Sequence, residues 1–377
     1  MFHPEDLRSA KFTAGAPEAT CAQDATQPVQ EKRNENRPHT QVTVEELVQQ
    51  IKEAADQLLA DRADRGDVKI LATAIKELRH ALSLFARYRH LRKVTIFGSA
   101  RTPRDHPAYQ AAVAFARKMA ELGFMIITGA ASGIMEAGHV GAGKERSLGI
   151  NIRLPFEQAA NPVIAADDTR LVNFKYFFTR KLMFVKEADA VALFPGGFGT
   201  LDEGFEALTL VQTGKSHMFP ILLIDEPGGN YWRTFDQFLR EMLLRREYIS
   251  PQDLALYKVT DNIDEAVAEI RQFYRVYHSM RYVGRKHYLV LRLRSILPPE
   301  LLERIRQEFA DMVAGETFEL VPADPEEHND VHLMHLPRLR FQFDRRSLGR
   351  LRQLIDFLNR EAPDPIFPEV PPAVPAI

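Results

Sequence analysis

The sequence predicts an α/β fold, in which a doubly wound parallel sheet follows N-terminal helices and precedes a small α+β unit. Through the centre of the chain, short apolar segments alternate with stretches of helical periodicity, as in parallel strands covered on both faces. Glycine-rich turns follow several of these apolar segments. Towards the C-terminus the alternation changes to the period of two that marks half-exposed strands. With 45% hydrophobic and 27% charged residues, the composition is that of a soluble globular protein.

The N-terminal part is predicted to contain a tail and two helices. Residues 1–40 are rich in Pro, Asn, Gln, Thr and charge and show no periodicity, so we expect a disordered tail. Within 41–90, apolar residues recur at helical spacing over 43–59, and a second helix follows. Thr43 is placed to cap the first helix, and Glu46 lies three residues on, where it would complete a capping box.

Residues 91–278 are predicted to form the parallel α/β domain. The expected strands cover 93–100, 123–133, 147–154, 188–197 and 219–225. Helices are expected directly after the second strand and over 107–122, 172–187, 200–213 and 232–249. Glycine turns at 98, 129–133 and 196–199 lie at carboxyl ends of these strands, where such sheets bind their ligands.

A second, smaller domain is predicted over 285–361. A strand at 287–294 alternates apolar and polar residues, and a helix, two strands and a final helix follow. The order β-α-β-β-α indicates a small α+β domain attached to the main one. Residues 362–377 form a proline-rich tail.

The charge balance argues against nucleic-acid and membrane partners. The 49 Lys and Arg residues nearly balance the 51 Asp and Glu residues, giving a formal charge of -2. The N-terminus has no apolar leader, and no apolar run reaches the roughly 18 residues of a spanning helix. The one cysteine, Cys21, cannot form an intrachain disulfide, which fits a reducing cytoplasm. We therefore expect a cytoplasmic protein.

The segment "FPGGFGTLDEGFEAL" at 194–208 carries the strongest chemical signal. Free N–H groups and the dipole of a helix N-terminus favour an anion, and glycines let the backbone approach phosphate oxygens. Thr200 can cap the helix and donate its hydroxyl to the same phosphate. The alternative is a tight turn whose glycines serve only geometry. Asp202 and Glu203 follow the loop directly, beside the place where the rest of a phosphate ligand would lie.

A basic pair lies upstream of this loop. Arg180 and Lys181 begin a stretch 16 residues before Gly196, which leaves room for a helix and a strand returning to the same sheet edge. A guanidinium there could pair with phosphate or with charge that develops on a substrate. The alternative is a cationic helix face exposed to water.

Three other patterns are weaker. "GHVGAGKE" at 138–145 has the spacing of a Walker A loop, but it follows a helix and ends in Glu where the magnesium-binding Ser or Thr belongs. Three histidines could hold a metal, although surface histidines in a loop are the simpler interpretation: His328, His332 and His335. The basic run at 345–353 has its apolar residues at helical spacing, which favours a solvated helix face over an RNA site.

Taken together, the motifs resemble those of the LONELY GUY (LOG) family, long labelled as lysine decarboxylases. "PGGFGTLDE" matches the family's PGGxGTxxE motif, and "TRK" stands at its Arg-Lys position with the expected spacing. Four further segments look like the bacterial branch: "FGSAR" (97–101), "GIMEAG" (133–138), "LPFEQAANP" (154–162) and "EALTLVQTGK" (206–215). The resemblance covers roughly residues 90–275 and neither the tail nor the last hundred residues.

The resemblance implies a Rossmann-like fold of the LOG type and hydrolysis of the N-glycosidic bond of nucleoside 5′-monophosphates, giving free base and ribose 5-phosphate. Some relatives release cytokinins from their ribotides. By motif position, Arg180 and Glu203 would be the catalytic pair. The residues expected to contact the nucleotide are Gly98, Ser99, Gly129, Gly133, Glu157, Asn161, Lys181, Gly196, Gly197, Gly199, Thr200, Asp202 and Thr209. No metal or other cofactor is expected, and relatives form homodimers or higher homo-oligomers.

The sequence departs from the family in the first glycine loop. Relatives commonly have a glycine triplet there, whereas this chain has Gly129-Ala130-Ala131-Ser132-Gly133. We expect the two methyl groups to narrow the phosphate or ribose pocket, which affects substrate preference more than the reaction.

The residues also account for such chemistry. Cleavage of a C1′–N bond passes through an oxocarbenium-like transition state, which a carboxylate beside the ribose can stabilise. A lysine decarboxylase would need a Schiff-base lysine and a pyridoxal site, which no motif marks. The main alternative is a non-catalytic carrier of a nucleotide or of molybdenum cofactor with the same fold. A third hypothesis gives the C-terminal domain a role in regulation or interaction.

Overall fold

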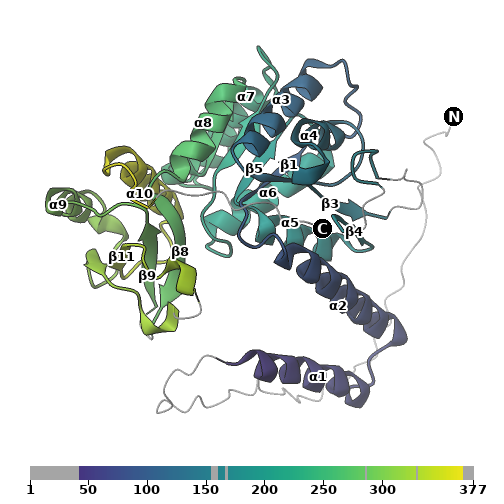
Figure 1. Cartoon of the computed structure of the whole chain (residues 1–377), viewed down its shortest axis with the longest axis horizontal. Coiled ribbons are helices and arrows are strands. Elements are labelled where there is room, and N and C mark those ends of the chain that lie inside the picture. Colours follow the sequence, from purple (N-terminus) through teal and green to yellow (C-terminus); the bar gives the residue numbers. More distant parts are fainter. Residues whose placement is uncertain (1–41, 154–159, 166–168, 285–286, 328–329, 368–377) are drawn as a thin grey trace, which may run out of the picture. The chain divides into compact units, whose positions relative to one another are not determined.

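The computed structural model describes residues 42–153, 160–165, 169–284, 287–327 and 330–367 (Figure 1). The tail predicted at 1–40 lies outside these ranges. The proline-rich tail at 362–377 also lies outside them, apart from residues 362–367. Residues 1–42 and 43–377 are two separate units, and all that follows concerns the second unit. No described helix is long and apolar enough to cross a membrane.

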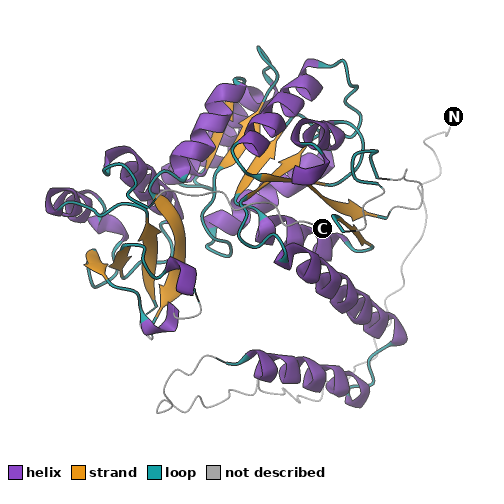
Figure 2. Cartoon of the chain, viewed as in Figure 1, coloured by secondary structure: helices purple, strands orange, loops and turns teal. Residues whose placement is uncertain are grey.

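The described part of residues 91–278 contains a parallel sheet of seven strands with helices on both faces, which confirms the predicted α/β class (Figure 2). The strand order is β4-β3-β2-β1-β5-β6-β7. The strands are β1 (Lys93–Phe97), β2 (Met125–Thr128), β3 (Ser147–Ile152), β4 (Leu171–Phe174), β5 (Ala190–Leu193), β6 (Ile221–Ile224) and β7 (Tyr257–Thr260). From β1 the chain winds outward through β2, β3 and β4 and then returns to β5 on the other side. The doubly wound sheet therefore has its switch point between β1 and β5.

Two of these strands were not predicted. β4 begins where the sequence predicted a helix over 172–187, and the helix itself starts only at Phe177. The short β4 lies at the edge of the sheet, pairs with β3 and supplies no turn signal before the helix. β7 is the opposite edge strand and is half exposed, so it lacks the continuous apolar run of a buried parallel strand.

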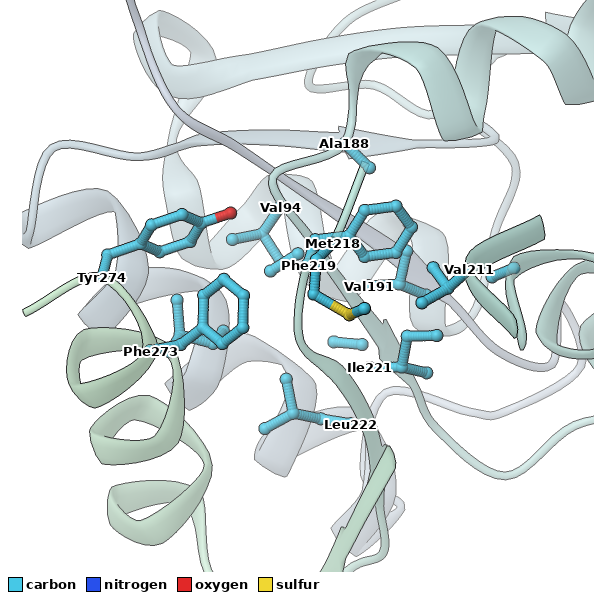
Figure 3. Packing of buried hydrophobic residues seen from close by; sticks show 14 of the residues in the cluster. Val94, Ala188, Val191, Val211, Met218, Phe219, Ile221, Leu222, Phe273 and Tyr274 are labelled. Carbon is cyan, nitrogen blue, oxygen red and sulfur yellow. The ribbon is translucent and has the colours of Figure 1, made fainter. Parts of the chain in front are cut away.

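The helices of this region are α3 (Pro107–Glu121), α4 (Ile134–Ala142), α5 (Phe177–Glu187), α6 (Phe198–Gln212), α7 (Tyr231–Phe238) and α8 (Ile263–Phe273). The helix predicted over 232–249 is shorter, because α7 changes at Leu239 into a π-helical turn that ends at Leu244. Every residue of β1, β2, β5 and β6 is buried. Figure 3 shows side chains from β1, β5 and β6 gathered with Val211 of α6 and Phe273 of α8 in the main hydrophobic core.

The two N-terminal helices are α1 (Val44–Ala60) and α2 (Arg65–Ala86). The capping box predicted for the first helix is present: the Thr43 hydroxyl accepts from the Glu46 amide at 3.2 Å, and the Thr43 amide donates to the Glu46 carboxylate at 2.7 Å. α1 has no buried residue, whereas α2 packs its second half into the core.

The C-terminal part has a four-stranded antiparallel sheet in the order β10-β11-β9-β8. Its elements are β8 (Tyr277–Val283), β9 (Tyr288–Leu293), α9 (Pro299–Glu308), β10 (Glu319–Val321), β11 (Arg338–Phe341) and α10 (Leu348–Glu361). The order β-α-β-β-α predicted for 285–361 is confirmed by β9, α9, β10, β11 and α10. β8, which ends before residue 285, adds a strand to this sheet that was not predicted. β8 is an edge strand whose inner residues are only half buried, so its sequence lacks a clear apolar alternation.

Asn359 of α10 is a buried polar link to the end of α8 and the start of β8. Its side-chain oxygen accepts from the amides of Val276 at 2.8 Å and Tyr277 at 3.0 Å, and its amide donates to the Phe273 carbonyl. Asn359→Leu should leave these backbone groups buried without partners and lower the free energy of unfolding by about 2–4 kcal/mol. Urea unfolding measures the change, with Arg360→Ala on the exposed face of the same helix as the control.

Candidate active site

A cavity of about 880 Å³ lies at the carboxyl end of the parallel sheet. The turns that follow β1, β2 and β5 line it, together with residues of α5 and the first turn of α6. It therefore lies at the switch point between β1 and β5, where doubly wound sheets bind ligands.

The turn between β5 and α6 combines packing glycines with open ones. A Cβ on Gly196 would lie 2.1 Å from the Thr200 hydroxyl oxygen and 3.0 Å from the Ser99 amide nitrogen, so only glycine fits there. At Gly197 and Gly199 a Cβ would meet nothing within 4 Å. Gly197 and Gly199 therefore leave the N-terminus of α6 open to the cavity. The turn needs glycine at Gly196 for its own packing and also leaves room for an anion beside the other two.

The turns after β1 and β2 are tied to this one through Ser99. The Ser99 amide donates to the Pro195 carbonyl at 3.1 Å, and the Ser99 carbonyl accepts from the Ile134 amide at 3.0 Å. Gly133 has φ +65°, and a Cβ there would lie 2.3 Å from the Ser99 carbonyl oxygen. The three turns form one rigid edge around the cavity.

Arg180 of α5 reaches into the cavity from the side of β3. Its Nε donates to the Ile150 carbonyl at 2.9 Å, and its guanidinium carbon lies 5.0 Å from the centre of the Phe184 ring. A Cβ on Gly129 would lie 2.4 Å from Nη2 of Arg180. The missing side chain at Gly129 is therefore what allows the guanidinium to lie where it does.

Glu203, in the first part of α6, is a buried carboxyl with only 7% of its surface exposed. Burial raises its pKa to about 7, because removal from water disfavours the charged form. The cations of Lys181 and Arg180 lower the pKa, and the neighbouring Glu206 and Asp202 raise it. Such a carboxyl changes its protonation state near neutral pH, as groups in active sites often do.

Lys181 is held by carboxylates of α6. Its ammonium lies 2.8 Å from an oxygen of Asp202 and 2.8 Å from an oxygen of Glu206. Burial opposes the charged form, but these ion pairs prevail and raise the pKa of Lys181. In this arrangement its charge is directed at the first turns of α6 and contributes to the positive potential at Glu203.

Most predicted site residues lie around this one cavity. Those that line it are Gly98, Ser99, Gly129, Arg180, Gly196, Gly197, Gly199, Thr200, Asp202 and Glu203. Thr209 is exposed on α6 and Asn161 is buried, and neither is part of the lining. The Asn161 side-chain amide donates to the carbonyls of Ala130 and Ala131, so it supports the first glycine loop. Glu157 lies outside the described residues.

Only one of the two methyl groups expected to narrow the phosphate or ribose pocket lines the cavity. Ala130 has φ +60° and is fully buried, with its side chain packed against Ile164 and Leu171 rather than lining the cavity. Ala131 does line the cavity. The Ser132 hydroxyl donates to the Ala100 carbonyl at 2.9 Å and joins the first two turns.

Several lining residues were not predicted. Asn151 from the end of β3, Phe177 at the start of α5 and Phe198 at the start of α6 all contribute to the cavity. The side chain of Phe198 is 93% exposed and that of Phe177 is 51% exposed. In the sequence these aromatic residues could not be told from helix residues that face the core. The Tyr231 hydroxyl also donates to the Gly196 carbonyl at 2.6 Å and supports the glycine turn.

The weaker sequence patterns lie in other settings. Gly138 is inside α4, so the Walker-like segment is not a strand-to-helix loop. The His332 ring contacts His90 and the His335 ring contacts Phe367, while His328 lies outside the described residues. The basic run of α10 holds ion pairs, from Arg350 to Asp311 and from Arg352 to Glu269 and Asp356.

These features define a doubly wound α/β protein whose glycine turns face a buried, readily titrated carboxyl across one cavity. Comparison with known proteins shows what this part of the chain is similar to. Residues 128–270 match the family model described as "Possible lysine decarboxylase". The resemblance to the LOG family predicted from the motifs is confirmed over this part of the chain.

Curated relatives match a shorter stretch of the chain. A cytokinin riboside 5′-monophosphate phosphoribohydrolase from Mycobacterium tuberculosis is 33% identical over 103 residues, or 27% of this chain and 52% of the relative. Cytokinin riboside 5′-monophosphate phosphoribohydrolase LOG7 from Arabidopsis thaliana is 30% identical over 94 residues, or 25% of this chain and 42% of the relative. The chain thus spans about half or less of the curated relatives it matches.

Among solved structures, a molybdenum cofactor binding protein from Rippkaea orientalis is similar at 20% identity, over 48% of this chain and 94% of that chain. The TM-score is 0.34, which carries no argument for a shared function.

The buried Glu203 should have a measurable effect on stability. Its pKa of about 7 lies above the ordinary value of 4.5 for a glutamate side chain, so between these two pH values the folded state holds a proton that the unfolded state releases. This contribution to stability is present below pH 4.5 and is lost as the pH rises to about 7. Glu203→Gln removes the buried charge and should raise the free energy of unfolding at pH 8 by about 2–3 kcal/mol, with little gain at pH 5. Urea unfolding at both pH values tests this, and Glu121→Gln on the exposed end of α3 should change neither.

Proposed function

We propose that this protein hydrolyses the N-glycosidic bond of nucleoside 5′-monophosphates to free base and ribose 5-phosphate. One observation carries the proposal: Glu203 and Arg180 line the same cavity as the open glycine turn at the start of α6. The phosphoribohydrolase names of the curated relatives support it. The proposed catalytic domain is residues 91–278, with the small domain at 285–361 attached to it.

In the proposed mechanism the 5′-phosphate binds at the N-terminus of α6, against the turns after β1 and β2. Gly197 and Gly199 provide the open approach, and the helix dipole favours the anion. Binding energy at the phosphate then positions the ribose, so that C1′ lies near the buried carboxyl. The remote phosphate thereby supplies part of the orientation that bond cleavage needs.

Glu203 acts in its ionised form. As the C1′–N bond breaks and its electron pair leaves with the base, the carboxylate stabilises the positive charge on the ribose. It also orients the attacking water and accepts a proton from it as the new C1′–O bond forms. That proton then passes to the nitrogen of the departing base, which leaves a neutral base and restores the carboxylate. Arg180 lowers the pKa of Glu203 and can pair with negative charge on the substrate.

Lys181 is proposed to contact the nucleotide as well. In the structure its ammonium is held by Asp202 and Glu206, of which Asp202 has a 60% exposed side chain. An exposed carboxylate contributes at most about 1 kcal/mol to an ion pair, so a phosphate oxygen can replace Asp202 at the ammonium while Glu206 stays in place. Glu157 and Thr209 remain proposed contacts of the nucleotide. Asn161 is proposed to act indirectly, by supporting the first glycine loop through the carbonyls of Ala130 and Ala131.

A panel of nucleotides tests the reaction. AMP, GMP, CMP, UMP and isopentenyladenosine monophosphate would each be incubated with the full chain, and free base quantified. The corresponding nucleosides, which lack the phosphate, are the matched controls. We expect release from monophosphates and at least about 100-fold less from nucleosides, because the phosphate contacts position the sugar. Equal rates for AMP and adenosine would contradict the assigned role of the glycine turn.

The same panel ranks cytokinin ribotides against common nucleotides. The half-exposed Phe177 and the exposed Phe198 at the cavity favour an apolar group on the base, such as an isopentenyl chain. A preference for the isopentenyl compound over AMP would support the finer substrate assignment.

The proposed partner of the protein is a second copy of the chain, and the proposed location is the cytoplasm. Exposed apolar residues of α5 support the contact between copies: Phe177, Phe178 and Leu182.

The alternative is a carrier that binds a nucleotide or molybdenum cofactor without changing it. A carrier has no need of a buried carboxyl with a pKa near 7 beside an arginine. Calorimetry with AMP, run beside the assay, separates the two functions. Binding of AMP with no release of adenine would favour the carrier.

A further inference from the structure

His139 of α4 is a fully buried histidine behind the first glycine loop, and it is not among the described residues that line the cavity. Its two ring nitrogens join three separate segments of the chain. Nε2 lies 3.1 Å from the Leu148 carbonyl oxygen of β3 and 3.1 Å from the Thr128 hydroxyl oxygen at the end of β2. Nδ1 lies 3.1 Å from the side-chain nitrogen of Asn161. A buried imidazole with partners at both nitrogens has a fixed orientation.

The same partners fix which ring nitrogen of His139 carries the hydrogen. A carbonyl oxygen can only accept, so Nε2 donates to Leu148 and Nδ1 is left as the acceptor. Nδ1 then accepts from the side-chain amide of Asn161. Burial lowers the pKa of His139 to about 4, so the ring is uncharged at neutral pH and keeps this acceptor.

Both branches from His139 lead to the backbone of Ala130. The Thr128 hydroxyl oxygen accepts from the Ala130 amide at 3.0 Å. The Ala130 carbonyl accepts from the side-chain amide of Asn161 at 3.1 Å and from its backbone amide at 2.8 Å. The same side-chain amide donates to the Ala131 carbonyl at 3.2 Å. The backbone on both sides of the Ala130 α-carbon is therefore held by residues that His139 orients.

Ala130 needs this support because its φ is +60°. That left-handed conformation is unfavourable for a residue with a Cβ and persists only where the surroundings hold it. The next residue, Ala131, lines the cavity. A return of Ala130 to an ordinary negative φ would redirect the chain at Ala131 and change that wall of the cavity.

We propose that His139 is a positioning residue for nucleotide binding. It acts through its two partners, which hold Ala130 in the left-handed turn and so place Ala131 on the cavity wall. The inference rests on the proposed function for the identity of the ligand, a nucleoside 5′-monophosphate. Glu203 lies on α6 and Arg180 on α5, outside this loop, so loss of the support should change affinity more than the rate of bond cleavage.

His139→Leu tests this role, because leucine has a similar volume and neither nitrogen. KM for AMP should rise about tenfold while kcat changes less than about threefold, as expected for the loss of one buried hydrogen-bonded support. Calorimetry with AMP in the Glu203→Gln background, which suppresses turnover, should show the same rise in Kd. Asn359→Leu is the matched control, since it removes a buried polar link in α10 and should leave KM and Kd unchanged.

A merely structural role of His139 predicts a different result. Loss of folded protein lowers kcat and the number of AMP molecules bound per chain, but it leaves KM and Kd at their normal values. Thr128→Val is a milder variant of nearly the same shape, which serves where His139→Leu fails to fold. It loses the hydroxyl that accepts from the Ala130 amide and should raise KM in the same direction.

Rescue by glycine is the sharpest measurement, because glycine adopts a positive φ without steric cost. Adding Ala130→Gly to His139→Leu should lower KM again by about threefold to fivefold. An unchanged KM and Kd in both His139→Leu and Thr128→Val, or a double variant no better than His139→Leu, would overturn the proposal.

The two readouts separate this proposal from the proposed hydrolysis. A chain that binds AMP and releases no adenine, yet shows the rise in Kd in His139→Leu, would overturn the hydrolysis and support the positioning role. Release of adenine with KM and Kd unchanged in the variants would do the reverse. Absence of both AMP binding and adenine release in the unaltered chain would overturn both.

Discussion

Glu203→Gln is expected to lower kcat for base release by about 10³-fold, within the range measured for loss of a catalytic acid–base group or of transition-state stabilisation. Glutamine keeps the shape of the side chain but can neither carry the negative charge that stabilises C1′ nor accept a proton from water. The same change should stabilise the fold at pH 8, so low activity could not be ascribed to unfolding. Glu121→Gln is the control, because Glu121 is an exposed carboxylate at the end of α3 and does not line the cavity.

The unaltered enzyme should show the titration of this carboxyl. Since the ionised form is the active one and its pKa is about 7, kcat/KM should rise with pH and level off above pH 7. On the acid side it should fall about tenfold per pH unit. A rate that instead declines as the pH rises through 7 would mean that the protonated form is active, and would contradict the assignment of Glu203 as the stabilising carboxylate.

Arg180→Gln is expected to lower kcat/KM by about 10²-fold to 10³-fold. The guanidinium is held by the Ile150 carbonyl and faces the cavity beside Gly129, so glutamine loses both the charge and its placement. A second effect follows, because Arg180 lowers the pKa of Glu203. Removing the cation should therefore move the acid limb of the pH profile to higher pH.

That shift separates a direct role of Arg180 from a merely structural one. Lys175→Gln, an exposed lysine just before α5, is the control and should change neither the rate nor the pH profile. A loss of rate in Arg180→Gln with the acid limb unmoved would show that the guanidinium does not act on Glu203.

The parts of the fold that surround the cavity were the most predictable from the sequence. β1, β2 and β5 are short, fully buried apolar runs, and each ends in a glycine turn, so periodicity and turn chemistry agree. The edge strands β4, β7 and β8 were missed, because an edge strand is partly exposed or short and its pattern merges with its neighbours. The sequence pattern thus located the strand ends around the cavity more accurately than it located the outermost strands of the sheets.

The candidate site divides in the same way. Glycines and charged residues near the strand ends could be assigned from the sequence, since their types imply close backbone approach or ion pairing. Burial of Glu203 and its shifted pKa depend on tertiary structure, which also brings Arg180 and Lys181 of α5 near the carboxyl, and no local pattern encodes this. The orientation of Ala130 away from the cavity also depends on tertiary packing, against Ile164 and Leu171.

One measurement tests the central claim most directly. The full chain would be incubated with an excess of AMP, and adenine and ribose 5-phosphate would be quantified over time beside Glu203→Gln. The account predicts many equivalents of both products per chain, in equal amounts, and a loss of about 10³-fold in the variant. Retention of AMP unchanged at a fixed number of molecules per chain, with neither product formed, would contradict hydrolysis and favour a carrier.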